Sequence, residues 1–288
     1  MIFRVIRDHL TPEFTVTDCC RVLRVSVSGY YRWRQQPVGK RETRRRELTE
    51  QIRLVHEASR RVYGSPRVYR ELSKHGVTAC RNTVAKVMRD EKIVSRMRRK
   101  WRAKTTDSKH AYPVAPNLIE RDFRAAGPNL LWLGDITYIP TLEGFLYLAT
   151  VLDLFSRRIV GWSMADHLRA ELPLAALRMA VAQRRPAPGL IHHSDRGVQY
   201  ACVEYRRTLE EHGMHASMSH KGDCYDNAPQ ESFFGKFKTE WVPEKPYATR
   251  EEARASAFEY IEAFYNRKRL HSSLGYVSPE AFEASHGL

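Results

Sequence analysis

An aspartate lies inside a strongly apolar stretch of this chain. The run from Leu130 to Ile139 reads LLWLGDITYI, and its leucine, aromatic and β-branched residues are typical of a buried strand. An ionised Asp135 is costly to bury in such a strand unless a cation or a dense set of hydrogen-bond donors faces it. Any fold of this chain must therefore supply a cation or a dense set of donors at this point, and bound metal ions are the simplest way to do so.

Two more acids follow apolar segments. Asp195 comes after Gly189-Leu190-Ile191, which predicts a short strand that Ile191 closes, and Glu231 lies in the first turns of a segment with helical apolar spacing. Three acids from two strands and a helix can hold two divalent cations about 3.5–4 Å apart, an arrangement suited to phosphodiester chemistry. Oxygen ligands favour Mg²⁺ or Mn²⁺. Taken singly, the same acids fit a strand-end cap, a turn residue and a solvated helix residue.

The spacing of these acids carries a resemblance. Asp195 and Glu231 are separated by 35 residues, and Lys238 follows Glu231 by seven, as in the catalytic core of retroviral integrases and related transposases. The chain is most similar to the second reading-frame product (OrfB) of the insertion sequence 3 family of bacterial transposases. Six strings carry this similarity along nearly the whole chain: WLGDITYI from Trp132, LDLFSR from Leu152, HHSDRG from His192, GDCYDNA from Gly222, ESFF from Glu231, and YNR…HSSLGY from Tyr265.

The resemblance implies a fold, an activity and partners. It implies a ribonuclease H-like integrase catalytic core, an α/β fold in which Asp135, Asp195 and Glu231 meet as catalytic residues and hold two Mg²⁺ or Mn²⁺ ions. The implied reaction is metal-dependent cleavage at the ends of an insertion sequence, followed by strand transfer. The implied partners are double-stranded DNA, both element ends and target, further copies of this chain on that DNA, and a first-frame product (OrfA) as partner or fusion.

Charge is distributed unevenly along the chain. The formal net charge is +15, but residues 1–110 hold 28 Lys or Arg against 11 Asp or Glu, whereas residues 111–288 hold 20 against 22. A basic front half suggests a polyanionic partner. We expect a helical DNA-binding region over 1–94, a basic linker over 95–117, and the catalytic domain with its C-terminal helices over 118–288.

Two segments of the front half have helix-turn-helix outlines, at about 14–36 and 65–92. In the first, Thr17 and Ser28 are candidate caps, and the second helix presents Arg32 and Arg34 to DNA, while Trp33 is expected to pack the core. In the second, a helix from about Cys80 to Asp90 is expected to turn three apolar residues inward and four polar residues towards DNA: Val84, Val87 and Met88 inward, and Arg81, Asn82, Lys86 and Arg89 outward.

The back half predicts three strands followed by alternating helices and strands. Strands are expected at 130–139, 145–154 and 158–164, then a helix at 169–185, the strand that Ile191 closes, a helix at 203–212 and an edge strand at 214–218. This order favours a mixed α/β sheet with helices on both faces. Asn227 is expected to cap the Glu231 helix and share a face with Lys238, both as DNA-binding residues, and the core face comprises Phe233, Phe234, Phe237 and Trp241.

The cysteines, the hydropathy of the chain, two adjacent histidines and the C-terminal tail give further expectations about localisation and site. The five cysteines form no zinc-ligand spacing, and no membrane-spanning run occurs, so we expect a cytoplasmic, nucleoid-associated protein without a membrane partner. His192 and His193 are expected on opposite faces of their strand, one packed and the other near the acids or facing DNA. The tail from Arg250 is expected mainly to pack, with its basic end at 266–271 a secondary DNA contact.

Two rival hypotheses remain at the level of sequence. A metal nuclease of the same fold would cut DNA without joining it, but it has less use for two helix-turn-helix segments. A non-catalytic DNA-binding repressor, or an inactive transposase relative, has no need of three acids and Lys238 together.

Overall fold

The computed structural model describes residues 2–35, 40–96, 112–220 and 224–287. The first stretch is a small helical unit with its own core, which is built around Ile6 and Tyr30. Thr15, and not Thr17, caps the helix that begins at Val16. Ser26, and not Ser28, accepts the hydrogen bond at the start of the helix that begins at Val27. The elements of this unit are α1 (Ile2–Val5), the π-helix η1 (Ile6–Leu10), α2 (Val16–Val22) and α3 (Val27–Gln35).

The next three helices are α4 (Lys40–Ala58), α5 (Ser65–Lys74) and α6 (Arg81–Asp90). Their apolar side chains belong to one continuous core cluster that also includes the C-terminal part of the chain. The Tyr63 hydroxyl reinforces this junction: it donates to the Lys268 carbonyl at 3.0 Å and accepts from the Leu270 N–H at 2.9 Å. The helices from 40 to 90 are therefore attached to the chain's C-terminal region by packing and by hydrogen bonds.

The described residues include a sheet of five strands in the order β3-β2-β1-β4-β5. Strands β1, β2 and β3 are antiparallel neighbours, whereas β4 and β5 run parallel to β1, so the sheet is mixed as expected. Its centre is β1, with Trp132 buried on one face and Leu133 on the other. The strands are β1 (Leu131–Thr141), β2 (Gly144–Asp153), β3 (Ile159–Ala165), β4 (Ile191–Ser194) and β5 (His215–Met218).

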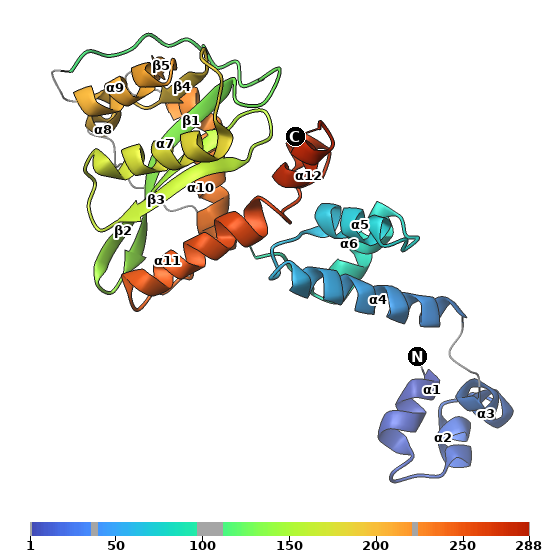
Figure 1. The fold of residues 1–288 in the computed structure, drawn as a ribbon. Coiled ribbons are helices and arrows are strands. Elements are labelled where there is room, and N and C mark those ends of the chain that lie inside the picture. The colour runs from blue at the N-terminus through green and yellow to red at the C-terminus, as the bar shows by residue number, and fades with distance from the viewer. Residues whose placement is uncertain (1, 36–39, 97–111, 221–223, 288) are drawn as a thin grey trace.

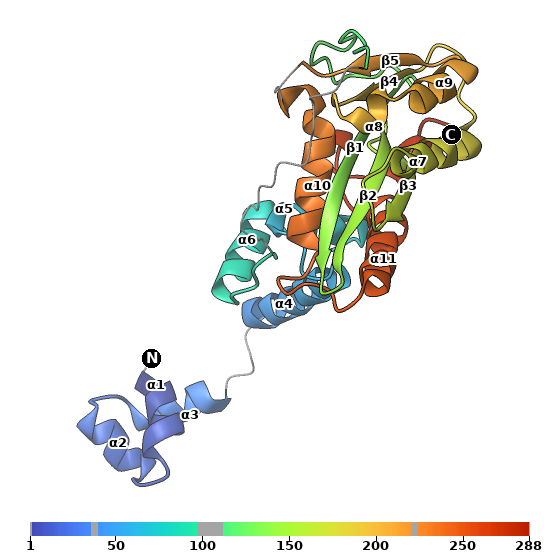
Figure 2. The ribbon, with the colours of Figure 1, turned by 90° about the vertical axis from the view of Figure 1, so that its left-hand side faces the viewer.

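Helices cover both faces of this sheet (Figures 1 and 2). The face that buries Trp132 carries α7 (Glu171–Arg184), α8 (Val198–Ala201) and α9 (Val203–Glu211). The face that buries Leu133 carries α10 (Ala228–Glu240) and α11 (Arg250–Phe258), which continues as the π-helix η3 (Glu259–Tyr265). Short turns of helix complete the chain: η2 (Cys224–Asn227), η4 (Ser272–Leu274) and α12 (Pro279–Ala284). Among the described helices, none has the length and apolar character needed to cross a membrane.

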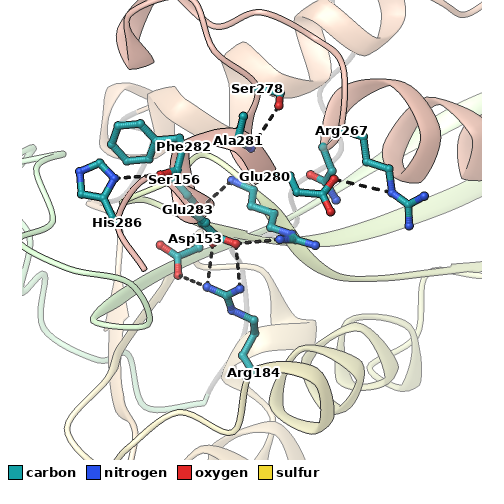
Figure 3. A network of polar contacts seen from close by, with 12 residues as sticks. Asp153, Ser156, Arg184, Arg267, Ser278, Glu280, Ala281, Phe282, Glu283 and His286 are labelled. Carbon is teal, nitrogen blue, oxygen red and sulfur yellow. Dashed lines mark hydrogen bonds and ion pairs between the residues drawn. The ribbon is translucent and has the colours of Figure 1, made fainter. Parts of the chain in front are cut away.

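The last helix is fastened to the sheet through one carboxylate (Figure 3). Ser278 caps α12 by accepting from the Ala281 N–H. Glu283, which is buried, accepts hydrogen bonds from Ser156 at 2.8 Å and from both Nη atoms of Arg184 at 2.8 and 3.0 Å. Arg158 adds a further bond at 2.7 Å. The C-terminal end is therefore held against the turn between β2 and β3, and packing is confirmed as the role of the tail.

Two predictions of local structure are wrong. The fourth strand does not end at Ile191 but begins there, because the histidines that follow are buried in it rather than solvated. The sequence also gave no sign of α8, a single turn between β4 and α9. In the basic segment at 266–271, Asn266, Arg269 and His271 are buried, whereas Arg267 and Lys268 are exposed, so only these two are open to the secondary DNA contact.

Candidate active site at the junction of β1, β4 and α10

Asp135 sits in the middle of β1, opposite Thr150 of β2. Its neighbours Trp132, Leu133 and Gly134 are buried, but the aspartate side chain is only partly so. One carboxylate oxygen accepts the N–H of Ile136 at 2.8 Å. The strand therefore presents a carboxylate at the margin of the core.

Asp195 is brought beside Asp135 by the register of parallel strands. Leu133 pairs with His193, and each aspartate lies two residues further along its own strand direction. Because neighbouring strands are about 4.8 Å apart, the two carboxylates come close together where β4 ends beside the middle of β1. The chain turns immediately after Asp195, whose Oδ1 accepts the Gly197 N–H at 2.9 Å.

The start of α10 is fixed to the same part of β1. Gln230, which is fully buried, donates to the carbonyls of Leu133 at 2.9 Å and Thr150 at 3.0 Å. Asn227 donates to the Gly134 carbonyl at 3.3 Å. These bonds place Glu231, the next residue after Gln230, on the exposed side of the helix near the two aspartates.

The three acids influence one another electrostatically. The pKa of Asp135 is raised well above its ordinary value, first by burial and then by the charges of Asp195 and Glu231. Lys238 opposes this rise, and its own pKa is lowered by burial, against the pull of Asp135. The Lys238 ammonium also lies 4.5 Å from the centre of the Tyr138 ring. Three acids and one lysine thus act on one another at the edge of the sheet.

The donor set suits a hard cation, but the coordination sphere is open. Mutually repelling carboxylates at a partly buried edge are what a divalent cation neutralises, and their oxygens are the ligands that Mg²⁺ and Mn²⁺ prefer. Among the described residues, however, no three His, Cys, Asp or Glu side chains are grouped closely enough to hold a metal ion. The three acids therefore influence one another electrostatically, but they are not grouped closely enough to enclose an ion.

Neither histidine of the HHSD string faces DNA. His192 and His193 are both buried, the first bonded to the Tyr205 hydroxyl at 3.1 Å and the second between the hydroxyls of Ser217 and Ser219. Burial lowers the pKa of His192 to about 3 and that of His193 to about 4, so both rings are neutral. Of the two alternatives for the second ring, the DNA-facing one does not hold, because hydroxyl groups from α9, from β5 and from the residue that follows β5 bond the two buried rings.

Asn227 is likewise not a DNA contact. It occupies the N-cap position of α10, but its side chain makes no capping bond and is buried against Gly134. The four core residues of α10 are buried as the periodicity predicts: Phe233, Phe234, Phe237 and Trp241.

The other predicted DNA-binding residues lie on exposed faces. On α6, Val84, Val87 and Met88 are buried and the four polar residues are exposed: Arg81, Asn82, Lys86 and Arg89. On α3, Arg32 and Arg34 are exposed, while Trp33 packs against the small core as expected. The basic stretch of the linker at 97–111 lies outside the described residues, as does Asp223.

Sequence reasoning missed two groups that build the site. Gln230 had no role in the predicted pattern, because glutamine is ordinarily an exposed residue and nothing local marks this one as buried. Asp226, in the GDCYDNA string, is buried and accepts from Arg121 at 3.0 Å, from the His220 N–H at 2.8 Å and from Asn117 at 3.1 Å. It ties the segment before α10 to the chain that leads into β1.

Comparisons with known proteins agree with this architecture. Two family models described as integrase core domains match residues 125–224 and 212–279, and one described as an HTH-like domain matches residues 43–101. The chain is 43% identical to the "Insertion element IS600 uncharacterized 31 kDa protein" of Shigella sonnei, over 93% of this chain and 98% of that one.

A named transposase is equally similar. The chain is 42% identical to "Transposase InsF for insertion sequence IS3A" of Escherichia coli (strain K12), over 98% of both chains. Among solved structures, the simian T-cell lymphotropic virus intasome complex with the PP2A regulatory subunit B56 gamma matches over 81% of this chain and 73% of that one, at 16% identity and a TM-score of 0.44, which supports no argument about function. The identity to the curated relatives does: the chain belongs to the insertion sequence 3 (IS3) family of DDE-type transposases.

Proposed function

We propose that Asp135, Asp195 and Glu231 are the catalytic residues with which this chain cleaves DNA at insertion-sequence ends and joins the freed 3′ hydroxyl to target DNA. One observation carries this assignment: strand register and the Gln230 anchor bring all three acids to the same edge of β1.

The same three carboxylates would hold two Mg²⁺ or Mn²⁺ ions. When bound, these ions supply charge stabilisation and an acidified attacking hydroxyl for phosphodiester chemistry. Asp195, held by the Gly197 N–H, and Asp135, held by the Ile136 N–H, would keep fixed orientations. Glu231 is exposed, so its side chain would be able to rotate towards the ions and join the two aspartates in holding them.

The remaining residues would position DNA. Lys238, on the face of α10 that Glu231 occupies, would contact a phosphate next to the scissile bond. The exposed side of α6, with Arg81, Asn82, Lys86 and Arg89, would read the element end, and Arg32 and Arg34 of α3 would add contacts in the first unit. We further propose that the chain works as an oligomer on paired ends, with a first-frame product as partner, and that 1–94, 95–117 and 118–288 are its functional divisions.

A cleavage and joining assay tests this proposal. The full chain, with Mg²⁺ or Mn²⁺, is incubated with labelled duplexes that carry the inverted repeats flanking its gene. We expect nicking and strand joining in the wild type, and loss of both by at least about 1,000-fold in Glu231→Gln, with DNA binding retained. Glu210→Gln, an exposed glutamate on α9, is the matched control and should stay active.

The outcomes separate the rival functions. Nicking without joining, lost in Glu231→Gln, would establish a nuclease. Binding without cleavage, even when a first-frame product is fused to the chain, would contradict the catalytic assignment. Loss of binding in Glu231→Gln would give that residue a structural role instead.

A further inference from the structure

A second group of charged residues lies where the α4–α6 helices meet the catalytic region. We name it the junction cluster, and it draws its cations from four separate parts of the chain: Arg67 of α5, Arg157 between β2 and β3, Lys236 of α10, and Arg269 after η3. Arg67 bonds the carbonyl of Leu270, the residue after Arg269, and Arg269 pairs with Glu240, one turn along α10 from Lys236. The charges of Arg67, Arg157 and Arg269 all lower the pKa of Lys236. The cluster thus forms only when the helical unit, the sheet and the tail come together.

Arg269 is already neutralised. It is 1% exposed, and its Nε and Nη2 atoms bond the two carboxylate oxygens of Glu240 at 2.7 and 2.5 Å. Two charge-assisted bonds in this fork geometry commit Glu240 to one guanidinium. Glu240 therefore forms no ion pair of this geometry with the other cations of the cluster, Arg67, Arg157 and Lys236.

The other three cations make bonds to neutral groups. Arg67 donates through Nε to the Leu270 carbonyl at 2.9 Å, and Arg157 donates to the Phe123 carbonyl at 3.3 Å. Lys236 donates to the Ser232 hydroxyl at 2.7 Å. All three side chains are partly exposed, so an anion from solution can reach them.

The positive charges of the cluster repel one another, and this lowers the pKa values of its members. The pKa of Lys236 falls to about 8, through burial first and then through Arg269, and burial followed by Arg269 also lowers the pKa of Arg67. His271, which stacks edge-on against Tyr265, has its pKa lowered to about 2 by burial and by the same cations. Excess positive charge held at a partly buried junction is the electrostatic condition for an anion site.

The cluster is separate from the proposed active site. On α10, Lys238 follows Glu231 by seven residues, which returns it to within about 20° of the same face, whereas Lys236 is rotated by about 140°. Lys236 shares its face with Glu240, four residues on, which contacts Arg269. In Figure 2, α10 stands between the sheet and α5 and α6, so its two faces look towards different parts of the molecule.

We propose that Arg67, Arg157 and Lys236 bind a phosphate group of the DNA backbone at the junction between the α4–α6 helices and the catalytic region. The inference rests on the proposed function, because it assumes one duplex that runs from the helix-turn-helix surface to the acids. Each guanidinium has five N–H donors and the ammonium three, which suffices for phosphate oxygens beyond the carbonyls and hydroxyl already bonded. Contacts of this kind fix register on DNA without reading sequence.

Binding of the full chain to DNA, measured in EDTA so that no cleavage occurs, tests the site. Lys236→Gln removes the charge but keeps a donor for Ser232. We expect its affinity for an element-end duplex to fall about fivefold to tenfold near 0.1 M salt, with the slope of log K against log salt reduced by about one. Lys236→Arg should bind like the wild type, which separates charge from misfolding.

Neutral methylphosphonates, placed one at a time along the duplex, locate the contact. At one or two adjacent positions a methylphosphonate should weaken DNA binding by the wild type but leave DNA binding by Lys236→Gln unchanged. Arg207→Gln, an exposed arginine on α9 across the sheet, is the control and should show no such coupling. The proposal would be overturned if the methylphosphonate and Lys236→Gln had additive effects on binding at every position. It would also be overturned if Lys236→Gln left the slope of log K against log salt unchanged.

The test does not depend on catalysis. If the wild type binds and couples but never cleaves, the active-site assignment fails while the phosphate site stands. If cleavage occurs but coupling is absent, the phosphate site alone fails. An unrelated duplex should show the same loss in slope, because a backbone contact is independent of sequence.

Discussion

The side-chain amide of Gln230 donates to the main-chain carbonyl of Leu133 at 2.9 Å, two residues before Asp135 on the central strand. A second bond, to the Thr150 carbonyl, spans the adjacent strand. One buried amide therefore fixes the start of α10 against both β1 and β2. Glu231 follows Gln230 directly, so its distance from the aspartates depends on this anchor.

Replacing Gln230 should lower stability and slow cleavage but leave DNA binding intact. Gln230→Met keeps the approximate volume but leaves the buried carbonyls without their donor, which should lower the free energy of unfolding by about 1–3 kcal/mol. Cleavage should slow further than this loss explains, because Glu231 is no longer held, while DNA binding persists. Urea unfolding and cleavage rates measure the two effects, and Gln51→Met, an exposed residue of α4, should change neither. A Gln230→Met variant that is as active as the wild type would refute the anchoring role.

Metal binding should relieve the repulsion between the acids. Because Asp195 and Glu231 help to raise the pKa of Asp135, the ionised centre destabilises the metal-free fold at pH 7. Asp195→Asn, which can still accept the Gly197 N–H, should raise the metal-free Tm. Millimolar Mg²⁺ or Mn²⁺ should raise the Tm of the wild type by several degrees, and that of Asp195→Asn by much less.

An exposed aspartate gives the control for this measurement. Asp166→Asn removes one carboxylate far from Asp135 in the sequence and should keep the full response to metal. Equal shifts in all three proteins would mean that the ions bind elsewhere, and EDTA should reverse any shift that arises at the acids.

Sequence periodicity predicts the parts of this fold that repeat locally. The aromatic face of α10 and the two-sided character of α6 follow from helical spacing, and the order of strands and helices from segment composition. The meeting of the acids follows from the family resemblance and not from spacing alone. The start of β4 could not be predicted, because His192 and His193 count as polar until their hydroxyl partners from residues 205, 217 and 219 are known.

Buried charge was the least predictable feature. Arg269 lies in a basic segment that is typical of a surface, and only Glu240, on a helix 29 residues earlier, explains its burial. Asp226 and Glu283 are buried for the same reason, through arginines distant in the sequence. Such pairs depend on which elements the fold brings together, and no local pattern encodes that choice.

The buried histidines should make the fold sensitive to acid. The pKa values of His192 and His193 in the folded chain, about 3 and about 4, lie below the ordinary 6.5, so the unfolded chain binds more protons in between. Stability should therefore fall as pH drops below about 6.5, by up to about 1.4 kcal/mol per pH unit for each ring. His193→Asn should lose less stability than the wild type between pH 6.5 and 4.5 in urea unfolding. The exposed His75, replaced by Asn, should leave the wild-type pH profile unchanged, and a parallel profile for His193→Asn would contradict the assignment.

The ion pair of Arg269 and Glu240 should behave as a unit. Arg269→Met leaves Glu240 charged without its guanidinium, and Glu240→Leu leaves a buried guanidinium unpaired, so each should lower the free energy of unfolding by about 3–5 kcal/mol. The double variant removes both charges beside the rings of Tyr260 and Tyr265 and should be more stable than the sum of the two losses predicts. A urea-unfolding cycle measures the coupling, with the surface pair Arg207 and Glu211 as the additive control. Additivity at Arg269 and Glu240 would mean that water reaches the pair, because only a desolvated pair penalises each single loss so heavily.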